Sequence, residues 1–280
     1  MNDSLRILTQ RILKLPTVPP VADKIIQLVS SKASVVNSIV ETIETDPAIS
    51  AKVISFANAA FFRTGQPVTI IQDAVMKIGF DNVKSIALGI ALLTLFKGKQ
   101  DTDEGGYHNI NRHSMVVGVF SKEIVDFMGW KNHEDVFTNG LLHDLGLMVM
   151  NAFFPEIYAG IEDKFKTGMS FPDAENEVCG FTHGEIGAWL ADKWNLPNNM
   201  CEVIRHHHNP SLSSSPAAAI VHLADIIAIR RGFSPMSSVG FEGPLDIAVM
   251  RLLGMNEERI EQFESGIEEI IAMATICGYD

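Results

Sequence analysis

Residues 140–146 read Gly-Leu-Leu-His-Asp-Leu-Gly and set an adjacent His143–Asp144 pair inside an apolar run that we expect to be helical. Burying such a pair costs free energy unless another group binds it. Successive side chains on a helix point about 100° apart, so the two can converge on one ion while the carboxylate stays free to bridge to a second. The alternative is a capped core histidine beside a surface aspartate, which is the better interpretation of an isolated His-Asp dipeptide.

Outward from this stretch, apolar residues recur at helical spacing along nearly the whole chain. The run 86–96 is apolar on nearly all faces, and we expect it to lie centrally, between the two halves of the chain. Only 66–71 alternates between apolar and polar residues, and it is at most a marginal strand. The predicted fold class is all-α. Helices are predicted over 21–29, 35–43, 48–60, 70–78, 81–96, 109–128, 134–152, 155–167, 171–178, 183–194, 197–208, 216–230, 244–253 and 256–275.

Composition divides the chain into three parts. Residues 97–106, Lys-Gly-Lys-Gln-Asp-Thr-Asp-Glu-Gly-Gly, are polar and charged and end in glycine, which indicates a linker or a long loop. We therefore predict an N-terminal helical subdomain over 1–100 and a second helical subdomain over 101–230, which together form a two-part helical bundle. Residues 231–280 are too short for a further signalling domain, and we predict a helical extension there.

The chain has 280 residues, of which 46% are hydrophobic, which is enough for a sizeable core. It has 34 acidic and 22 basic side chains and a formal charge of −12, so we expect no binding to nucleic acid or to a membrane. Its longest apolar run is too short to span a bilayer, and its N-terminus has no apolar signal core. Three scattered cysteines without a CxxC pair indicate reduced thiols, so we expect a cytoplasmic protein.

All nine histidines lie in the second half of the chain. Histidine is the commonest metal ligand and the usual acid–base group near neutral pH, so this segregation indicates a functional site. The histidines are His108, His113, His133, His143, His183, His206, His207, His208 and His222.

The order of these residues resembles that of the HD superfamily of metal-dependent phosphohydrolases. Members of that superfamily have a histidine on one helix, then the His-Asp doublet, further histidines and a late aspartate. The positions that match this core pattern are His113, His143, Asp144 and Asp225. The positions that match the extra ligands of two-metal members are His183, His207 and His208.

Further motifs are closer still to one branch, the HDOD domain (HD-related output domain), which the chain resembles over residues 15–230. The resemblance implies an all-α fold with an HD-like helical core in the C-terminal half. It also implies a bacterial signalling module, since most HDOD domains have no known catalytic activity. The matching segments are Leu15–Pro19, Asp46–Ala48, Phe56–Phe62, Ala74–Gly79, Gly140–Gly146, His183–Leu190, Trp194–Pro197 and Ile204–Pro210.

The resemblance implies one or two divalent metal ions, of Fe, Mn, Zn or Ni. Nitrogen and oxygen donors without thiolates suit these metals and argue against a structural zinc site. In a two-metal arrangement Asp144 bridges ions about 3.5–4 Å apart, which activate a water for attack on a phosphoester. One ion is then held by His113, His143 and Asp225, and the other by His183, His207 and His208. His206 is placed outside, because the family has Tyr there. Alternatively, the histidines form a hydrogen-bonded core network.

Three departures argue against catalysis. Leu147 stands where active members of the related HD-GYP branch have a lysine that neutralises phosphate. Asn209-Pro210-Ser211 follows the paired histidines where that branch has Gly-Tyr-Pro. The nearest candidates for a basic cluster, Arg112, Lys193 and Arg205, are scattered, whereas phosphoryl substrates usually need such charges. We therefore expect no hydrolysis of cyclic dinucleotides.

Three functions stay open: a signalling module that binds a protein partner or a small ligand, a metal-dependent phosphohydrolase acting on a nucleotide or similar phosphoester, and a scaffold or sensor locked by bound metal. Homo-oligomerisation also stays open. In the first half of the chain, a short polar residue beside paired aromatics is a candidate docking groove for a partner helix. An equally good interpretation is a helix end with a buried aromatic pair. The residues concerned are Asn58, Phe61, Phe62 and Arg63.

Overall fold

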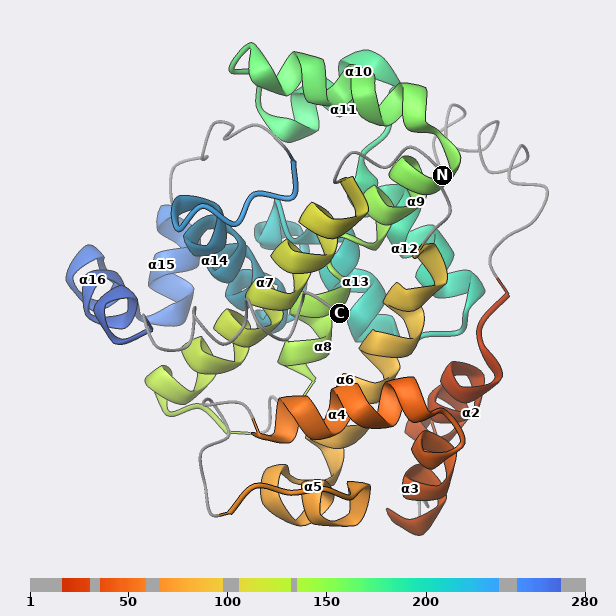
Figure 1. Cartoon of the computed structure of the whole chain (residues 1–280). Coiled ribbons are helices and arrows are strands. Elements are labelled where there is room, and N and C mark those ends of the chain that lie inside the picture. The colour runs from red at the N-terminus through yellow and green to blue at the C-terminus, as the bar shows by residue number, and fades with distance from the viewer. Residues whose placement is uncertain are drawn as a thin grey trace.

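Figure 1 shows the chain as a computed structural model, which describes residues 17–30, 36–58, 66–97, 106–131, 135–236 and 246–267. Within these ranges the chain folds into α-helices and two short 3₁₀ helices, without any β-strand, so the predicted all-α class is confirmed. The marginal strand over 66–71 is wrong, because residues 66–70 are irregular and a helix begins at Ile71. None of the helices in the described part is both long and apolar enough to cross a lipid bilayer.

The helices of the first half are α2 (Pro20–Ser30), α3 (Val36–Glu44), α4 (Pro47–Asn58), α5 (Ile71–Ile78) and α6 (Phe80–Leu93), followed by the 3₁₀ helix η2 (Thr94–Phe96). In Figure 1, α2 to α5 form the lower part of the molecule. The start predicted for α4 is confirmed. Asp46 accepts hydrogen bonds from the backbone N–H groups of Ala48 (2.9 Å) and Ile49 (3.1 Å), and Pro47 occupies the first turn.

The helices of the second half are α7 (Gly106–Met128), α8 (Val136–Leu142), α9 (Leu145–Phe153), α10 (Pro155–Lys166), α11 (Phe171–Val178), α12 (His183–Lys193), α13 (Asn198–His206), α14 (Pro216–Arg230), α15 (Ile247–Leu253) and α16 (Glu257–Gly266), with the 3₁₀ helix η3 (Pro210–Leu212) after α13. The single helix predicted over 134–152 is wrong, because it breaks into α8 and α9. The helix predicted over 197–208 ends at His206. In Figure 1, α10 and α11 lie across the top of the molecule.

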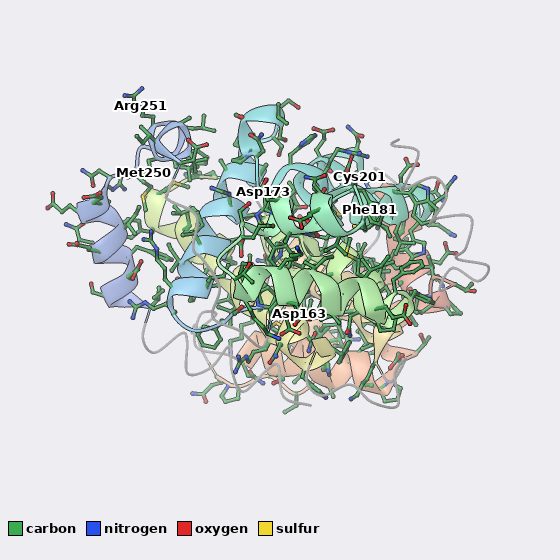
Figure 2. The ribbon with its side chains drawn as sticks, turned by 90° about the horizontal axis from the view of Figure 1, so that it is seen from above. Asp163, Asp173, Phe181, Cys201, Met250 and Arg251 are labelled. Atoms are coloured by element: carbon green, nitrogen blue, oxygen red, sulfur yellow. The ribbon has the colours of Figure 1, made fainter. Side chains whose placement is uncertain are left out.

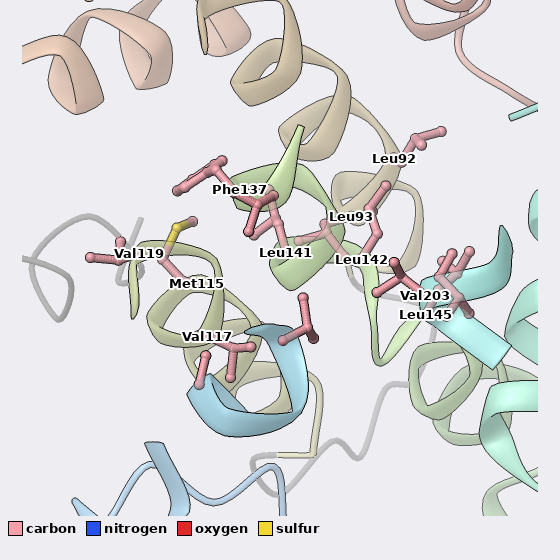
Figure 3. Close-up of a cluster of buried hydrophobic side chains, with 14 of the residues drawn as sticks. Leu92, Leu93, Met115, Val117, Val119, Phe137, Leu141, Leu142, Leu145 and Val203 are labelled. Carbon is pink, nitrogen blue, oxygen red and sulfur yellow. The ribbon is translucent and has the colours of Figure 1, made fainter. Parts of the chain in front are cut away.

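Helix α6 connects the two halves. Its side chains from Ser85 to Leu93 are all buried, and it packs against α2, α4 and α5 as well as against α8 of the second half. Gly89 lets α6 and α8 meet, since a Cβ there would lie 2.2 Å from Cδ2 of Leu141. Figure 3 shows the buried apolar side chains at this junction. The central position expected for 86–96 is therefore confirmed for the part within α6.

The last two described helices pack beside α7 and α14. The ring of Phe263 on α16 meets Phe120 and Phe127 of α7, at centroid distances of 6.4 and 5.7 Å. Arg231, just after α14, pairs with Glu264 at 3.3 Å. The C-terminal helices thus lie against the second half of the chain. The division of the chain into three parts at residues 100 and 230 stays a prediction.

Helices α7 and α8 cross at two glycines. A Cβ on Gly140 would lie 2.8 Å from both the Cα of Gly118 and the carbonyl oxygen of Val117. A Cβ on Gly118 would lie 2.9 Å from the carbonyl oxygen of Phe137. The two backbones are therefore in direct contact, and this contact sets the position of the segment that carries His143.

Gly140→Ala is expected to lower the free energy of unfolding by about 1–3 kcal/mol, because the added methyl group forces α7 and α8 apart. Urea unfolding measures this loss. Gly266→Ala is the matched control at the end of α16, where a Cβ would meet nothing within 4 Å, and we expect no loss of stability there. Equal unfolding midpoints for the two variants would contradict direct backbone contact between α7 and α8.

Candidate metal centre

The His143–Asp144 pair lies in a tight turn between two helices. Because α8 ends at Leu142 and α9 begins at Leu145, the prediction that the pair lies inside one helix is wrong. The turn packs directly on the start of α12, where a Cβ on Gly146 would lie 1.9 Å from the carbonyl oxygen of His183. Glycine at position 146 therefore allows the pair and His183 to approach each other closely.

The start of α12 holds His183 in place. Thr182 and Glu185 form a capping box: the Thr182 side chain accepts from the backbone N–H of Glu185 (3.2 Å), and the Glu185 carboxylate accepts from the backbone N–H of Thr182 (2.9 Å). One turn along, a Cβ on Gly187 would lie 2.8 Å from the backbone nitrogen of Gly146. The first turn of α12 is thus fixed against the turn between α8 and α9.

Four buried histidines share one hydrogen-bond pattern, in which Nδ1 binds an oxygen. His113, His143 and His207 place Nδ1 at 2.6, 2.6 and 2.9 Å from backbone carbonyl oxygens, those of Phe233, Gly140 and Ile204. His183 places Nδ1 at 2.7 Å from Oε1 of Glu175. A carbonyl or carboxylate oxygen accepts, so Nδ1 carries a proton and Nε2 is the ring atom that faces the centre, as in metal-ligating histidines.

The Nε2 atoms of these histidines converge in two pairs. Those of His113 and His143 lie 3.2 Å apart, and those of His183 and His207 lie 3.0 Å apart. Two lone pairs at such a distance repel each other unless a proton or a cation lies between them. The arrangement therefore fits a cation at each pair.

Asp144 lies between the two pairs and directs one oxygen at each. Its Oδ2 is 3.4 Å from Nε2 of His113 and 3.3 Å from that of His143. Its Oδ1 is 3.3 Å from Nε2 of His183 and 3.8 Å from that of His207. A carboxylate in this position can bridge two ions.

Asp225 and His208 complete the centre. Oδ1 of Asp225 is 3.1 Å from Nε2 of His113, and its Oδ2 is 3.8 Å from Nδ1 of His208. The His208 side chain is 31% exposed, whereas the other six side chains of the centre are at most 5% exposed. Solvent therefore reaches the centre on the side of His208.

Two groups of residues within the described ranges bring three potential ligand atoms to within 4.8 Å of one another. The first group is His113, His143 and Asp144, and the second group is His183, His207 and His208. The structure thus brings together all seven residues predicted from the sequence, with Asp225 beside the first group. Five imidazoles and two carboxylates suit divalent ions of the predicted kinds. Their role as metal ligands stays a prediction.

Carboxylates raise the pKa of two of the histidines. Burial lowers the pKa of His183, but the carboxylates of Glu175 and Asp144 outweigh it and raise this pKa to about 10. The same opposition between burial and the Asp144 and Asp225 carboxylates raises the pKa of His143. In turn, the pKa of Asp144 lies well below its ordinary value, because His143 and His183 outweigh the effect of burial.

The pKa values of His207 and His208, the other two members of the second group, are lowered. Burial, together with the nearby His183, lowers the pKa of His208 to about 3. Burial and the adjacent His208 lower the pKa of His207 well below its ordinary value. Both imidazoles are therefore neutral at neutral pH, which is the form that binds metal.

Three side chains around the centre were not identified from the sequence. Glu175 of α11 is fully buried against His183, and the ring of Phe171 meets that of His183 edge-on at 5.4 Å. His222 of α14 places Nδ1 at 2.7 Å from the carbonyl oxygen of His207. The late position of His222 near the Asp225 motif was the one available signal, whereas Glu175 belongs to no motif that we identified.

Asn58, the first of the predicted docking residues, has an internal role. Its side-chain amide donates to the carbonyl oxygen of Val68 and accepts from the backbone N–H of Val68, both at 2.8 Å. Lys77 adds a contact of 3.3 Å to the same amide oxygen. The other three docking residues, Phe61, Phe62 and Arg63, lie outside the described residues. Partner docking at this segment stays a prediction.

The helical fold and its buried centre of histidines and aspartates define an HD-type protein. The family model described as the HDOD domain matches residues 15–210, and the chain belongs to the HDOD family. This confirms the resemblance drawn from the sequence motifs.

Three further proteins are similar to this chain in sequence or in structure. An uncharacterised protein of Treponema pallidum (strain Nichols) is 24% identical over 72% of the chain, which spans only 39% of that protein. An HDOD domain protein of unknown function from Geobacter sulfurreducens has 24% identity and a TM-score of 0.81, over 98% of this chain and 97% of that one. A proposed signal transduction protein from Marinobacter aquaeolei VT8 has 25% identity and a TM-score of 0.75. The match covers 98% of this chain and 65% of that one.

The metal-free protein, kept in chelator, is expected to be most stable near pH 6.5. His207 and His208 have lowered pKa values, so the unfolded chain binds more protons and stability falls below about pH 6.5. His143 and His183 have raised pKa values, so their contribution is complete below about pH 6.5 and is lost as the pH rises toward 10.

Urea unfolding between pH 4.5 and 9.5 measures this profile. His208→Gln is expected to flatten the acid side, whereas His108→Gln, at an exposed position on α7, is the control and keeps the wild-type profile. If His208→Gln leaves the loss of stability at acid pH unchanged, the lowered pKa of His208 is contradicted.

Proposed function

We propose that the chain is a regulatory HDOD module of a bacterial signalling system, and that its centre holds two divalent ions which stabilise one arrangement of the helices. The observation that carries this proposal is the convergence of four buried Nε2 atoms around Asp144. Each facing pair of Nε2 atoms needs a proton or a cation between them, and a divalent ion gives both lone pairs of a pair a partner.

A metal centre of this kind connects segments that are far apart in the chain. Its ligands come from α7, the turn between α8 and α9, the start of α12, the turn after α13, and α14. Ligands on five segments respond together when metal or a small ligand binds, because binding to the folded arrangement stabilises it. That response suits a module which passes a change at the site to a protein partner. Similarity to the proposed signal transduction protein of Marinobacter supports this role.

The surroundings of the centre favour regulation over turnover. Leu147 is 1% exposed and belongs to the apolar core, at the position where active relatives carry a lysine. Arg112 lies over the ring of Phe233 at 5.5 Å, and Lys193 and Arg205 are exposed on α12 and α13. These three basic side chains form no cluster that would neutralise a phosphoester.

Asp144→Ala is expected to remove most of the bound metal, because its two oxygens face both groups of ligands. Mass spectrometry of protein purified without affinity nickel should find about two divalent ions per wild-type chain. Asp192→Ala, at an exposed position on α12, is the matched control and should keep the wild-type metal content. Equal metal content in the two variants would contradict the metal centre.

The bridging position of Asp144 favours a second function, a metal-dependent phosphohydrolase acting on a nucleotide or similar phosphoester. Asp144 would lie between two ions if both groups of ligands were occupied, and such ions would supply a water of lowered pKa for attack on a phosphoester. A proposed phosphohydrolase from Shewanella amazonensis SB2B shares the fold, with a TM-score of 0.76 and 21% identity over 98% of this chain and 97% of that one.

An activity assay separates the two functions. It measures the hydrolysis of bis(p-nitrophenyl) phosphate and of a panel of nucleotides by protein loaded with Mn²⁺ or Fe²⁺. We expect no turnover above that of Asp144→Ala, because Arg112, Lys193 and Arg205 form no basic cluster among the described residues around the centre. Turnover that is lost in Asp144→Ala and kept in Asp192→Ala would replace the regulatory proposal by the enzymatic one.

A further inference from the structure

Glu175 extends from the α10–α11 pair to the centre. Figure 2, seen from above, shows these two helices lying across the middle of the molecule, with Asp163 of α10 and Asp173 of α11 labelled. Most acidic side chains of α11 are exposed, as at Asp173 and Glu177, but Glu175 is 0% exposed. A fully buried carboxylate on an otherwise polar helix requires a specific partner.

That partner is His183. Oε1 of Glu175 accepts two hydrogen bonds from this one residue, from the ring Nδ1–H at 2.7 Å and from the backbone N–H at 2.8 Å. Its other oxygen, Oε2, is buried and has no hydrogen-bond partner among the described residues. Leaving a buried carboxylate oxygen unsatisfied costs free energy, so stability alone does not account for the residue.

Glu175 also makes the two ligand groups chemically unequal. His113, His143 and His207 place Nδ1 against neutral backbone carbonyls, and His183 alone among these four has an acidic side chain there. A carboxylate behind a ligating imidazole fixes its tautomer and its ring orientation and makes it a stronger donor. The edge of the Phe171 ring closes the other side of the His183 ring.

We infer that Glu175 is a positioning residue that directs Nε2 of His183 into the second group and strengthens metal binding by that group. The inference rests on the proposed metal centre and adds to it a residue on a helix that contributes no ligand. The double hydrogen bond holds both the ring and the first backbone N–H of α12. Glu175 thus connects the α10–α11 pair to the second group, and both of its hydrogen bonds go to His183 of that group.

Metal titration of the full chain by isothermal calorimetry, with Mn²⁺ and with Zn²⁺ after chelator has been removed, tests the inference. Glu175→Gln keeps an oxygen that accepts both hydrogen bonds but removes the charge, and it should weaken one of the two binding steps by about 10–100-fold. Glu177→Gln is the matched control, two residues along α11, where the exposed carboxylate pairs with Lys164, and it should leave both steps unchanged.

Each outcome has a distinct meaning. If the wild-type chain binds metal in two steps and Glu175→Gln weakens one of them, the positioning role is supported. If Glu175→Gln leaves both metal affinities unchanged and only lowers the unfolding midpoint in chelator, the residue is merely structural and the inference is overturned. If the wild-type chain binds no metal, the proposed function fails and this inference fails with it. Should Glu175→Gln not fold, Glu175→Asp keeps the charge at a shorter reach and should weaken the same step by a smaller factor.

Discussion

The structure depends on satisfying a carboxylate buried in the middle of a helical bundle. Asp144 is 3% exposed, and a charge at that depth is stable only when other groups compensate for the water it has lost. Imidazoles from both ligand groups surround it, and each of these rings is held from behind by an oxygen. Helices α7, α12 and α14 must therefore bring polar atoms to one point while their remaining faces form the apolar core. The proposed metal centre and the fold thus depend on the same arrangement of helices.

That constraint explains why glycines recur where helices cross. Nitrogen atoms from different segments lie 3.2 and 3.0 Å apart at the centre, which requires that the segments pack closely. Gly140 against Gly118 brings α8 onto α7, and Gly146 against Gly187 brings the start of α9 onto α12. A single methyl group at either crossing would displace ligands that come from different parts of the chain. The close packing of the core thus sets the distances between the residues of the centre, in addition to burying apolar side chains.

Local patterns in the sequence predicted much of this structure. Helical periodicity located nearly all the described helices, and the ordered histidines and aspartates predicted a centre whose seven residues do lie together. The break at His143 was missed, because no glycine or proline interrupts residues 141–145 and the turn is imposed by packing against α12. Glu175 was missed for a related reason. Its helix is amphipathic and acidic, so a glutamate there is expected to face solvent, and only the tertiary position of His183 brings it inside.

The charge of the centre bears on the proposed regulatory role. Asp144 and Asp225 carry two negative charges that one divalent ion neutralises and two ions exceed. In the proposed metal centre, the number of ions bound would therefore change how strongly an anionic ligand is attracted along the exposed edge of His208. Because His208 and His207 are neutral at neutral pH, their lone pairs are available to an ion without loss of a proton. Binding of an ion by His183 in the proposed centre would, in contrast, displace a proton that Glu175 and Asp144 help to hold, so metal occupancy would depend on pH.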